Sequence, residues 1–162
     1  MDVILDNCSL INIINGDILE EVLNLEGINF HIGPIVYDEF TQYKDGSILD
    51  EMISKGLLSR VGEDVVTIEE YRSMLDKYGL GDGETECLCI SRKFGYRMAS
   101  DDKKARSSGI KEIGRNRVIG SIFLLKRLVE KNVFNCSEAF ERYVFMKVSG
   151  GFLPDYKKDE FC

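Results

Sequence analysis

Acidic side chains follow two short apolar segments of the chain, and this pattern is typical of a site that binds a divalent cation. Asp6 comes directly after residues 3–5, and Asp101 and Asp102 follow residues 97–100. Both segments have the length and composition of buried strands. Because the carboxyl ends of parallel strands lie at the same edge of a sheet, we expect these distant carboxylates to converge there.

Two further acids are placed to join them. Glu39 lies in the first or second turn of a helix that Pro34 is expected to open, and Glu84 lies at the start of another helix, after Gly81. Closely packed carboxylates repel one another and have raised pKa values unless a cation lies among them. Because ligation by oxygen alone favours Mg²⁺ or Mn²⁺, the pattern predicts a site for one of these ions.

Each acid also has a purely structural explanation. Asp6 suits a turn, Glu84 a helix start and Glu39 a solvated helix face, and the acid pair at 101–102 would cap the helix that follows it. With 28 acidic residues in the chain, any one such placement is common. The metal site is favoured by the acids together and not by any one of them.

The elements that must position these acids alternate along the chain. Four strands are expected, at residues 3–5, 28–32, 97–100 and 118–120. Helices are expected from Asp17 and Thr67, which both begin capping boxes, and from Pro34, Glu84 and Ser121. This order predicts an α/β fold, a three-layer sandwich with a short central parallel sheet between helices. Without a linker or repeat, residues 1–162 are expected to form one domain with a polar C-terminal tail at 154–162.

The net charge of -7 argues at first against a partner such as nucleic acid, but the charge is segregated along the chain. Residues 1–91 carry 5 basic and 19 acidic side chains. Residues 92–117 carry 9 basic and 3 acidic ones, a net charge of +6. We therefore expect the acids to hold a cation and the basic segment to face phosphate.

Cysteine usage and the N-terminus predict a cytoplasmic protein without a membrane partner. The chain has five cysteines and a single histidine, and Cys87 and Cys89 are spaced C-x-C, which argues against a zinc site. We expect reduced thiols that mostly pack in the core. The N-terminus lacks the basic segment of a signal peptide, and no stretch approaches the roughly 20 apolar residues of a membrane helix.

The candidate acids stand in motifs that resemble the PIN-domain ribonucleases, specifically their branch of VapC-like toxins. In chain order the motifs are VILDNCSLINII, GPIVYDEF, GLGDGETECLCISRKFG, MASDDKKARSSG and VIGSIFLLKRLVEKNVF. The resemblance runs from residue 2 to about residue 153, and SEAFERYVFMKVSGGFLP is similar to the closing helix and Gly-aromatic ending of that branch.

The resemblance implies a Mg²⁺- or Mn²⁺-dependent endoribonuclease that leaves 3′-hydroxyl and 5′-phosphate ends. It implies a metal site and catalytic set made of Asp6, Glu84, Asp101 and Asp102, with Glu39 bound to the metal or just behind it. Arg106 matches a basic residue of the family's D-D-x-x-A-R stretch. Together with Lys103 and Lys104 it would hold substrate phosphates, although a solvated helix face is an equal alternative for all three.

Partners are implied in the same way. A VapC-like toxin would be a homodimer and would bind a small antitoxin protein that covers the acidic pocket. The apolar residues Ile48, Leu49, Met52 and Ile53 would suit an interface, although helical spacing of this kind more often indicates core.

The sequence departs from the family in two places. Cys8 stands where the family usually has Ser, Thr or Asn, which can bond the carboxylates of the metal site, so Ser9 or Asn7 would have to replace it. Residues 42–64 have no counterpart and would form a lid, a dimer contact or a variable helical excursion. Cys8 favours the alternative of an inactive PIN-like module that binds RNA or protein. A DNA nuclease of the flap-endonuclease type shares the acids, but its extra elements are not evident in 162 residues.

Overall fold

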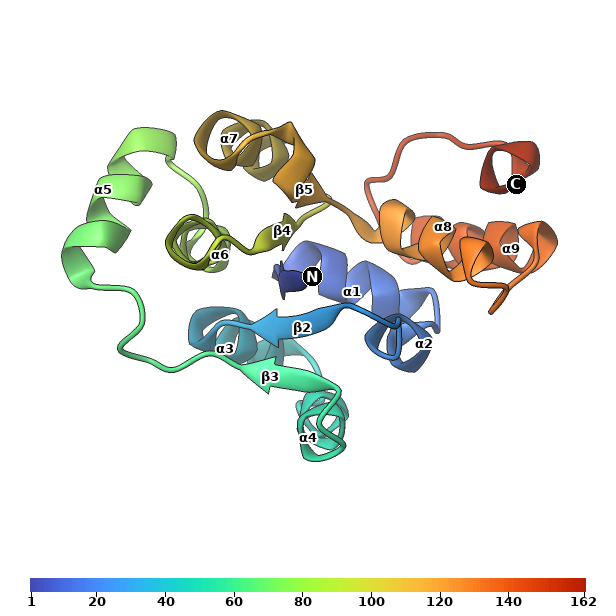
Figure 1. Ribbon diagram of the computed structural model, residues 1–162, viewed down its shortest axis with the longest axis horizontal. Coiled ribbons are helices and arrows are strands. Elements are labelled where there is room, and N and C mark those ends of the chain that lie inside the picture. Colours follow the sequence, from blue (N-terminus) through green and yellow to red (C-terminus); the bar gives the residue numbers. More distant parts are fainter.

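The computed structural model describes residues 1–162 and has a five-stranded sheet with helices on both sides (Figure 1). The strands are β1 (Asp2–Leu5), β2 (Asn29–Ile32), β3 (Leu58–Arg60), β4 (Arg97–Ala99) and β5 (Val118–Ile119). The helices are α1 (Asn7–Asn15), α2 (Leu19–Leu23), α3 (Pro34–Tyr43), α4 (Ser47–Ser54), α5 (Ile68–Tyr78), α6 (Asp82–Phe94), α7 (Lys103–Ile113), α8 (Ser121–Glu130) and α9 (Cys136–Val148). Two 3₁₀ turns span Arg115–Arg117 and Lys158–Phe161.

All strand pairs are parallel, in the order β3-β2-β1-β4-β5. The chain builds outward from β1 to β3 and then crosses to β4 on the other side of β1. The order therefore reverses between β1 and β4, and in open α/β sheets the crevice at such a reversal is where ligands bind. This confirms the predicted three-layer α/β sandwich and its parallel sheet.

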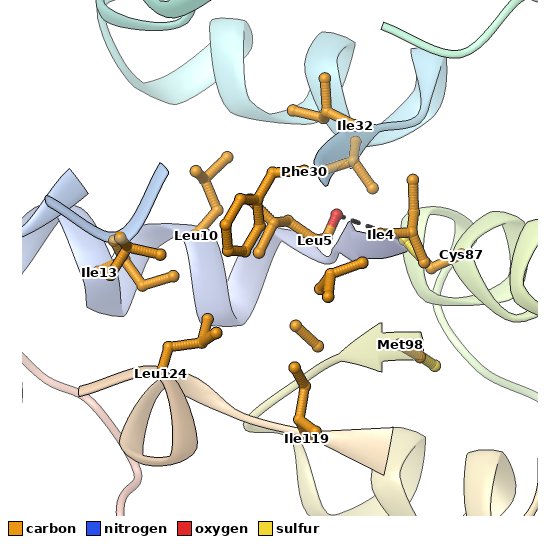
Figure 2. Packing of buried hydrophobic residues seen from close by; sticks show 14 of the residues in the cluster. Ile4, Leu5, Leu10, Ile13, Phe30, Ile32, Cys87, Met98, Ile119 and Leu124 are labelled. Atoms are coloured by element: carbon orange, nitrogen blue, oxygen red, sulfur yellow. Dashed lines mark hydrogen bonds between the residues drawn. The ribbon is translucent and has the colours of Figure 1, made fainter. Parts of the chain in front are cut away.

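The core lies on both faces of the central strand. Val3, Ile4 and Leu5 of β1 are completely buried, which explains why this strand is apolar without alternation. In Figure 2, Leu10 and Ile13 of α1 gather with core residues of the sheet on one side. On the other side, Cys87 of α6 donates a hydrogen bond to the Leu5 carbonyl, which fixes α6 across β1 (Figure 2). None of the helices is long and apolar enough to span a bilayer.

Two local predictions from the sequence were wrong. Asp17 does not cap α2, because it adopts a left-handed backbone (φ 53°) and the N-cap is Ile18, which has no side-chain hydrogen bond. A helix was also not expected at Asn7–Asn15, which follows β1 after Asp6; Asp6 is its N-cap. By contrast, the capping box of Thr67 and Glu70 is present at the start of α5.

Residues 42–64 contain the end of α3, the helix α4 and the edge strand β3, which pairs with β2 and extends the sheet. Leu49 and Met52 are buried in the core, whereas Ile48 and Ile53 are half-buried. The two central apolar residues of this segment, Leu49 and Met52, are therefore core residues.

The expectation that all cysteines are reduced was wrong for one pair. Cys136, at the start of α9, and Cys162 form a disulfide with their Cα atoms 5.3 Å apart. The pair meets because the C-terminal segment turns back along α9, with Phe161 packed on Tyr143. The other cysteines are free thiols: Cys87 and Cys89 are buried, and Cys8 is half-buried.

Candidate functional site

The reversal of strand order brings Asp6 and Asp101 to adjacent strand ends. Asp6 directly follows β1, and Asp101 follows β4 after one further residue, Ser100. The two strands pair directly, with Leu5 opposite Ala99, and the Asp6 amide donates a hydrogen bond to the Ala99 carbonyl (3.0 Å). The predicted convergence of these two acids is confirmed.

Asp6 is a fully buried carboxylate with one satisfied oxygen. Its Oδ1 accepts hydrogen bonds from the Ser9 amide (2.7 Å) and the Ser9 hydroxyl (2.8 Å), so that it caps α1. Its Oδ2 is buried without a hydrogen-bond partner. Burial raises the pKa of Asp6 to about 7, and the negative charge of Asp101 contributes to this shift.

Ser9 takes the place that Cys8 leaves open. Besides its bond to Asp6, its hydroxyl lies 2.8 Å from the Ala99 carbonyl oxygen, so that it ties α1 to the end of β4. Ser9 was one of the two replacements expected from the sequence, and these contacts support that choice.

Asp101 is held in place from two sides. Its Oδ2 accepts a hydrogen bond from Asn12 of α1 (2.9 Å), and its Oδ1 accepts one from the Ser121 amide at the start of α8 (3.0 Å). A Cβ on Gly120 would lie only 2.5 Å from Asp101 Oδ1 and 3.1 Å from the Ser100 carbonyl oxygen. Gly120 is therefore required for the close approach of Asp101 to this turn.

Asp102 has the structural role that was weighed against metal binding. It is the N-cap of α7, and its Oδ1 accepts a hydrogen bond from the Ala105 amide at 2.7 Å. The Asp102 amide in turn donates to the Ser100 hydroxyl (3.2 Å). One carboxylate oxygen of Asp102 thus caps α7, whereas both oxygens of Asp101 accept hydrogen bonds, from α1 and from the start of α8.

Glu39 and Glu84 lie together at the start of α6. Glu84 Oε2 accepts from the Gly81 amide (3.0 Å), and Glu39 Oε1, which reaches across from α3, accepts from the Gly83 amide (3.0 Å). Both glutamates line a small cavity of about 290 Å³ together with Cys8. Burial raises the pKa of Glu84, and the charges of Asp102 and Glu39 reinforce the shift.

Cys8 lies near several of the candidate acids, and their charges affect its pKa. Burial, reinforced by four negative charges, raises the pKa of the Cys8 thiol to about 12. Those charges belong to Asp6, Asp101, Asp102 and Glu84. Glu39 and Glu84 line the cavity beside Cys8, whereas Asp101 lines a different pocket. No three His, Cys, Asp or Glu side chains are gathered tightly enough to form a ready-made metal site.

The three basic residues expected to hold phosphate differ in their freedom. Arg106 Nη1 donates to the Ser100 carbonyl (2.8 Å) and the Ile119 carbonyl (2.7 Å), so it joins the ends of β4 and β5. Lys104 donates to the Gly79 carbonyl at the end of α5. Lys103 is exposed and has no hydrogen bond or ion pair with the rest of the chain. Of the three, Lys103 is the one left fully free for a ligand.

Sequence reasoning missed Glu86, a buried carboxylate two residues after Glu84. It accepts hydrogen bonds from the amides of Ile35 (3.0 Å) and Val36 (3.3 Å) at the start of α3. A Cβ on Gly33 would come within 2.1 Å of Glu86 Oε2. Glu86 thus positions the helix that carries Glu39. The only signal in the sequence was a charged residue among the apolar residues of the predicted helix.

These features define a class of α/β domains in which acids gather where the strand order of a parallel sheet reverses. A family model described as the PIN domain matches residues 2–148. The chain therefore belongs to the PIN-domain family, whose members are generally nucleases. The comparison with curated proteins found no match.

Proposed function

We propose that the protein is a Mg²⁺- or Mn²⁺-dependent endoribonuclease. The observation that carries the proposal is Asp6, a fully buried carboxylate at the strand reversal whose Oδ2 has no partner. A buried charge with one unpaired oxygen is unfavourable by up to several kcal/mol, on the order of what a bound cation would relieve. Membership of the PIN-domain family supports phosphodiester hydrolysis as the chemistry at this site.

The acids fit a hard cation. The pKa values of Asp6 and Glu84 are raised mainly by burial and also by neighbouring carboxylates, which is the condition that a divalent ion reverses. Asp6, Glu84 and Asp101 would hold it, with Glu39 behind them and Asp102 contributing the oxygen that does not cap α7. When bound, Mg²⁺ or Mn²⁺ supplies a water of lowered pKa and stabilises charge on the phosphate.

The chain's own residues supply orientation and binding. Ser9 fixes the rotamer of Asp6, and Asn12 with the Ser121 amide fixes Asp101, so that both carboxylates are positioned before substrate arrives. Lys103 has its ammonium group free to hold a phosphate next to the cleaved bond. Arg106 braces the strand ends with Nη1, and its other guanidinium nitrogens would contact phosphate.

The test is cleavage of structured and unstructured RNAs by the purified protein with Mg²⁺ or Mn²⁺. We expect products with 3′-hydroxyl and 5′-phosphate ends, abolished by EDTA and by Asp6→Asn, which preserves the cap on Ser9. Asp76→Asn changes an exposed acid of α5 and is the matched control. Cleavage that survives Asp6→Asn would contradict the assignment.

Metal binding can be measured apart from activity. A cation that binds only the folded state raises the unfolding temperature by mass action. We expect Mn²⁺ to raise the melting temperature of the wild type and of Asp76→Asn, and to raise that of Asp6→Asn less.

An inactive PIN-like module that binds RNA or protein is the second candidate. It is favoured by Cys8 in the family's hydroxyl or amide position and by the absence of three acids already within ligating distance of one another. Titration calorimetry separates the two candidates, because the inactive module is expected not to bind Mn²⁺ at millimolar concentration.

At the biological level we propose a cytoplasmic toxin of a toxin–antitoxin pair, acting as a homodimer and inhibited by a small antitoxin protein. The support is the motif resemblance. Growth arrest on expression, relieved by Asp6→Asn and by co-expression of a short neighbouring reading frame, is the expected result.

A further inference from the structure

A groove runs beside the acid site, on the side of Asp101. Its volume is about 860 Å³, and it lies between α7, β5, α8 and residues 152–156. We call it the C-terminal groove. Asp101 lines it, so the groove borders the candidate active site at this residue.

The lining of the C-terminal groove combines positive charge with aromatic rings. Lys103, Arg106 and Lys126 line it, and Asp101 is its only acid. Phe152 is 94% exposed and Phe123 is 37% exposed, although both are large apolar side chains. Basic groups that follow a backbone, together with exposed rings on which bases stack, are how proteins bind single-stranded nucleic acid.

The outer wall of this groove is fixed in place. The Tyr143 hydroxyl donates to the Pro154 carbonyl (2.8 Å) and accepts from the Tyr156 amide (3.0 Å). The Lys126 ammonium lies 4.9 Å from the centre of the Tyr156 ring. Leu153, next to Phe152, is buried. Phe152 is therefore presented to solvent by an anchored segment and is not part of a loose end.

This wall follows the part of the chain that the PIN-domain family model matches. The family match ends at residue 148, and the wall is built from residues 152–156. The C-terminal groove therefore combines α7, β5 and α8 of the matched domain with a wall that follows it in the chain.

We propose that the C-terminal groove binds a single-stranded RNA segment next to the cleaved bond, with a base stacked on Phe152 and phosphates on Lys103 and Lys126. The inference rests on the proposed ribonuclease function. A duplex is excluded from this mode, because its paired and stacked bases offer no free face to Phe152. The groove thus selects unpaired RNA.

The test measures binding in EDTA, so that cleavage does not enter. The probe is a single-stranded RNA of about ten nucleotides with 2-aminopurine at its centre, whose fluorescence is quenched by stacking, and the same RNA in a duplex serves for comparison. The variants are Phe152→Ala, Phe152→Trp and Lys103→Ala. Tyr43→Ala removes an 82% exposed ring outside the groove, and Lys131→Ala removes an exposed lysine outside it.

We expect Phe152→Ala to weaken single-strand binding about tenfold and to abolish the quenching, Phe152→Trp to retain both, and Lys103→Ala to weaken binding severalfold. The two control variants should bind like the wild type. Three results would each overturn the proposed role of the groove. They are unchanged affinity and quenching in Phe152→Ala and Lys103→Ala, equal binding of the duplex, and no binding by the wild type.

These outcomes are separable from the ribonuclease proposal. Cleavage that requires Asp6 but is indifferent to Phe152 would overturn the groove alone. Groove-dependent binding without metal-dependent cleavage would support the groove and overturn the nuclease.

Discussion

The most consequential residue is Asp6, because burial makes its charge unfavourable in the protein without metal. Its pKa is about 7 in the folded state, against an ordinary value of 3.8. Between these values the folded state keeps a proton that the unfolded state has lost. The free energy of unfolding should therefore fall as pH rises from about 4 to about 7 and change little through this group above that range.

From this we predict that, in EDTA, Asp6→Asn is more stable than the wild type at pH 8, by about 1–3 kcal/mol, and that the difference shrinks toward pH 4. Urea unfolding of both proteins at pH 4, 6 and 8 measures it, and Asp76→Asn should follow the wild type. The charge of Asp101 contributes to the raised pKa of Asp6, so Asp101→Asn should lower the pH at which the difference levels off. A difference that is constant with pH would contradict the prediction.

Gly120 sets how closely Asp101 approaches the start of α8. In Gly120→Ala the new methyl group would meet Asp101 Oδ1 at 2.5 Å and Arg106 Nη1 at 2.9 Å. We expect a loss of stability of about 1–3 kcal/mol and a drop in RNA cleavage of about a hundredfold, because Asp101 must move. Gly62→Ala is the control, since its nearest neighbour would lie at an ordinary 3.7 Å. Full activity in Gly120→Ala would show that the position of Asp101 is not critical.

At the scale of elements, α6 links the two halves of the site. Glu84 lies in the first turn of α6, near the other acids. Glu86 accepts hydrogen bonds from the start of α3 and thereby positions the helix that carries Glu39. Glu86→Ala would leave the amides of Ile35 and Val36 without this acceptor. The loss of stability for each amide is at most about 1–3 kcal/mol. Glu86→Gln keeps an acceptor oxygen and should lose less.

We expect both Glu86 variants to bind Mn²⁺ more weakly in proportion to their loss of stability, as measured by calorimetry alongside urea unfolding. Destabilisation in Glu86→Ala no greater than in Glu86→Gln would argue that the charge, and not the hydrogen bonds, positions α3.

The elements also show what could be predicted from the sequence. The strands β1, β2, β4 and β5 were predictable because each is a short run with apolar residues that ends at a polar residue or at glycine. The edge strand β3 was not, because two of its three residues are exposed and it gains its conformation from pairing with β2. α1 was missed because its β-branched, apolar sequence suits a strand as well as a helix.

The site was predictable to the extent that topology alone determines it. Asp6 and Asp101 had to meet once the sheet was parallel. Glu86 and the bond between Asn12 and Asp101 depend on how separate helices pack, which no local pattern encodes. The disulfide of Cys136 and Cys162 was missed for the same reason, since it depends on the return of the C-terminal segment along α9.

For the whole molecule, the positions of the charged residues matter more for RNA binding than the net charge of -7. Of the acids of residues 1–91, Asp6 and Glu84 lie with the pair at 101–102 near Cys8, and Lys103, Arg106 and Lys126 line the groove beside Asp101. Unscreened acids repel an RNA strand that the groove attracts. A bound cation would cancel that repulsion where the strand crosses from the groove to the acids.

We therefore predict that single-stranded RNA binds at least about tenfold more tightly in Ca²⁺ than in EDTA, with RNA integrity checked on a gel. In EDTA, two or three phosphate contacts should give a slope of log K against log salt of about -1.4 to -2.1. Asp6→Asn should lose part of the Ca²⁺ effect and keep the salt slope, whereas Lys103→Ala should keep the Ca²⁺ effect and lower the slope. Equal affinity in EDTA and Ca²⁺ would mean that the acids do not hold a cation in the path of the strand.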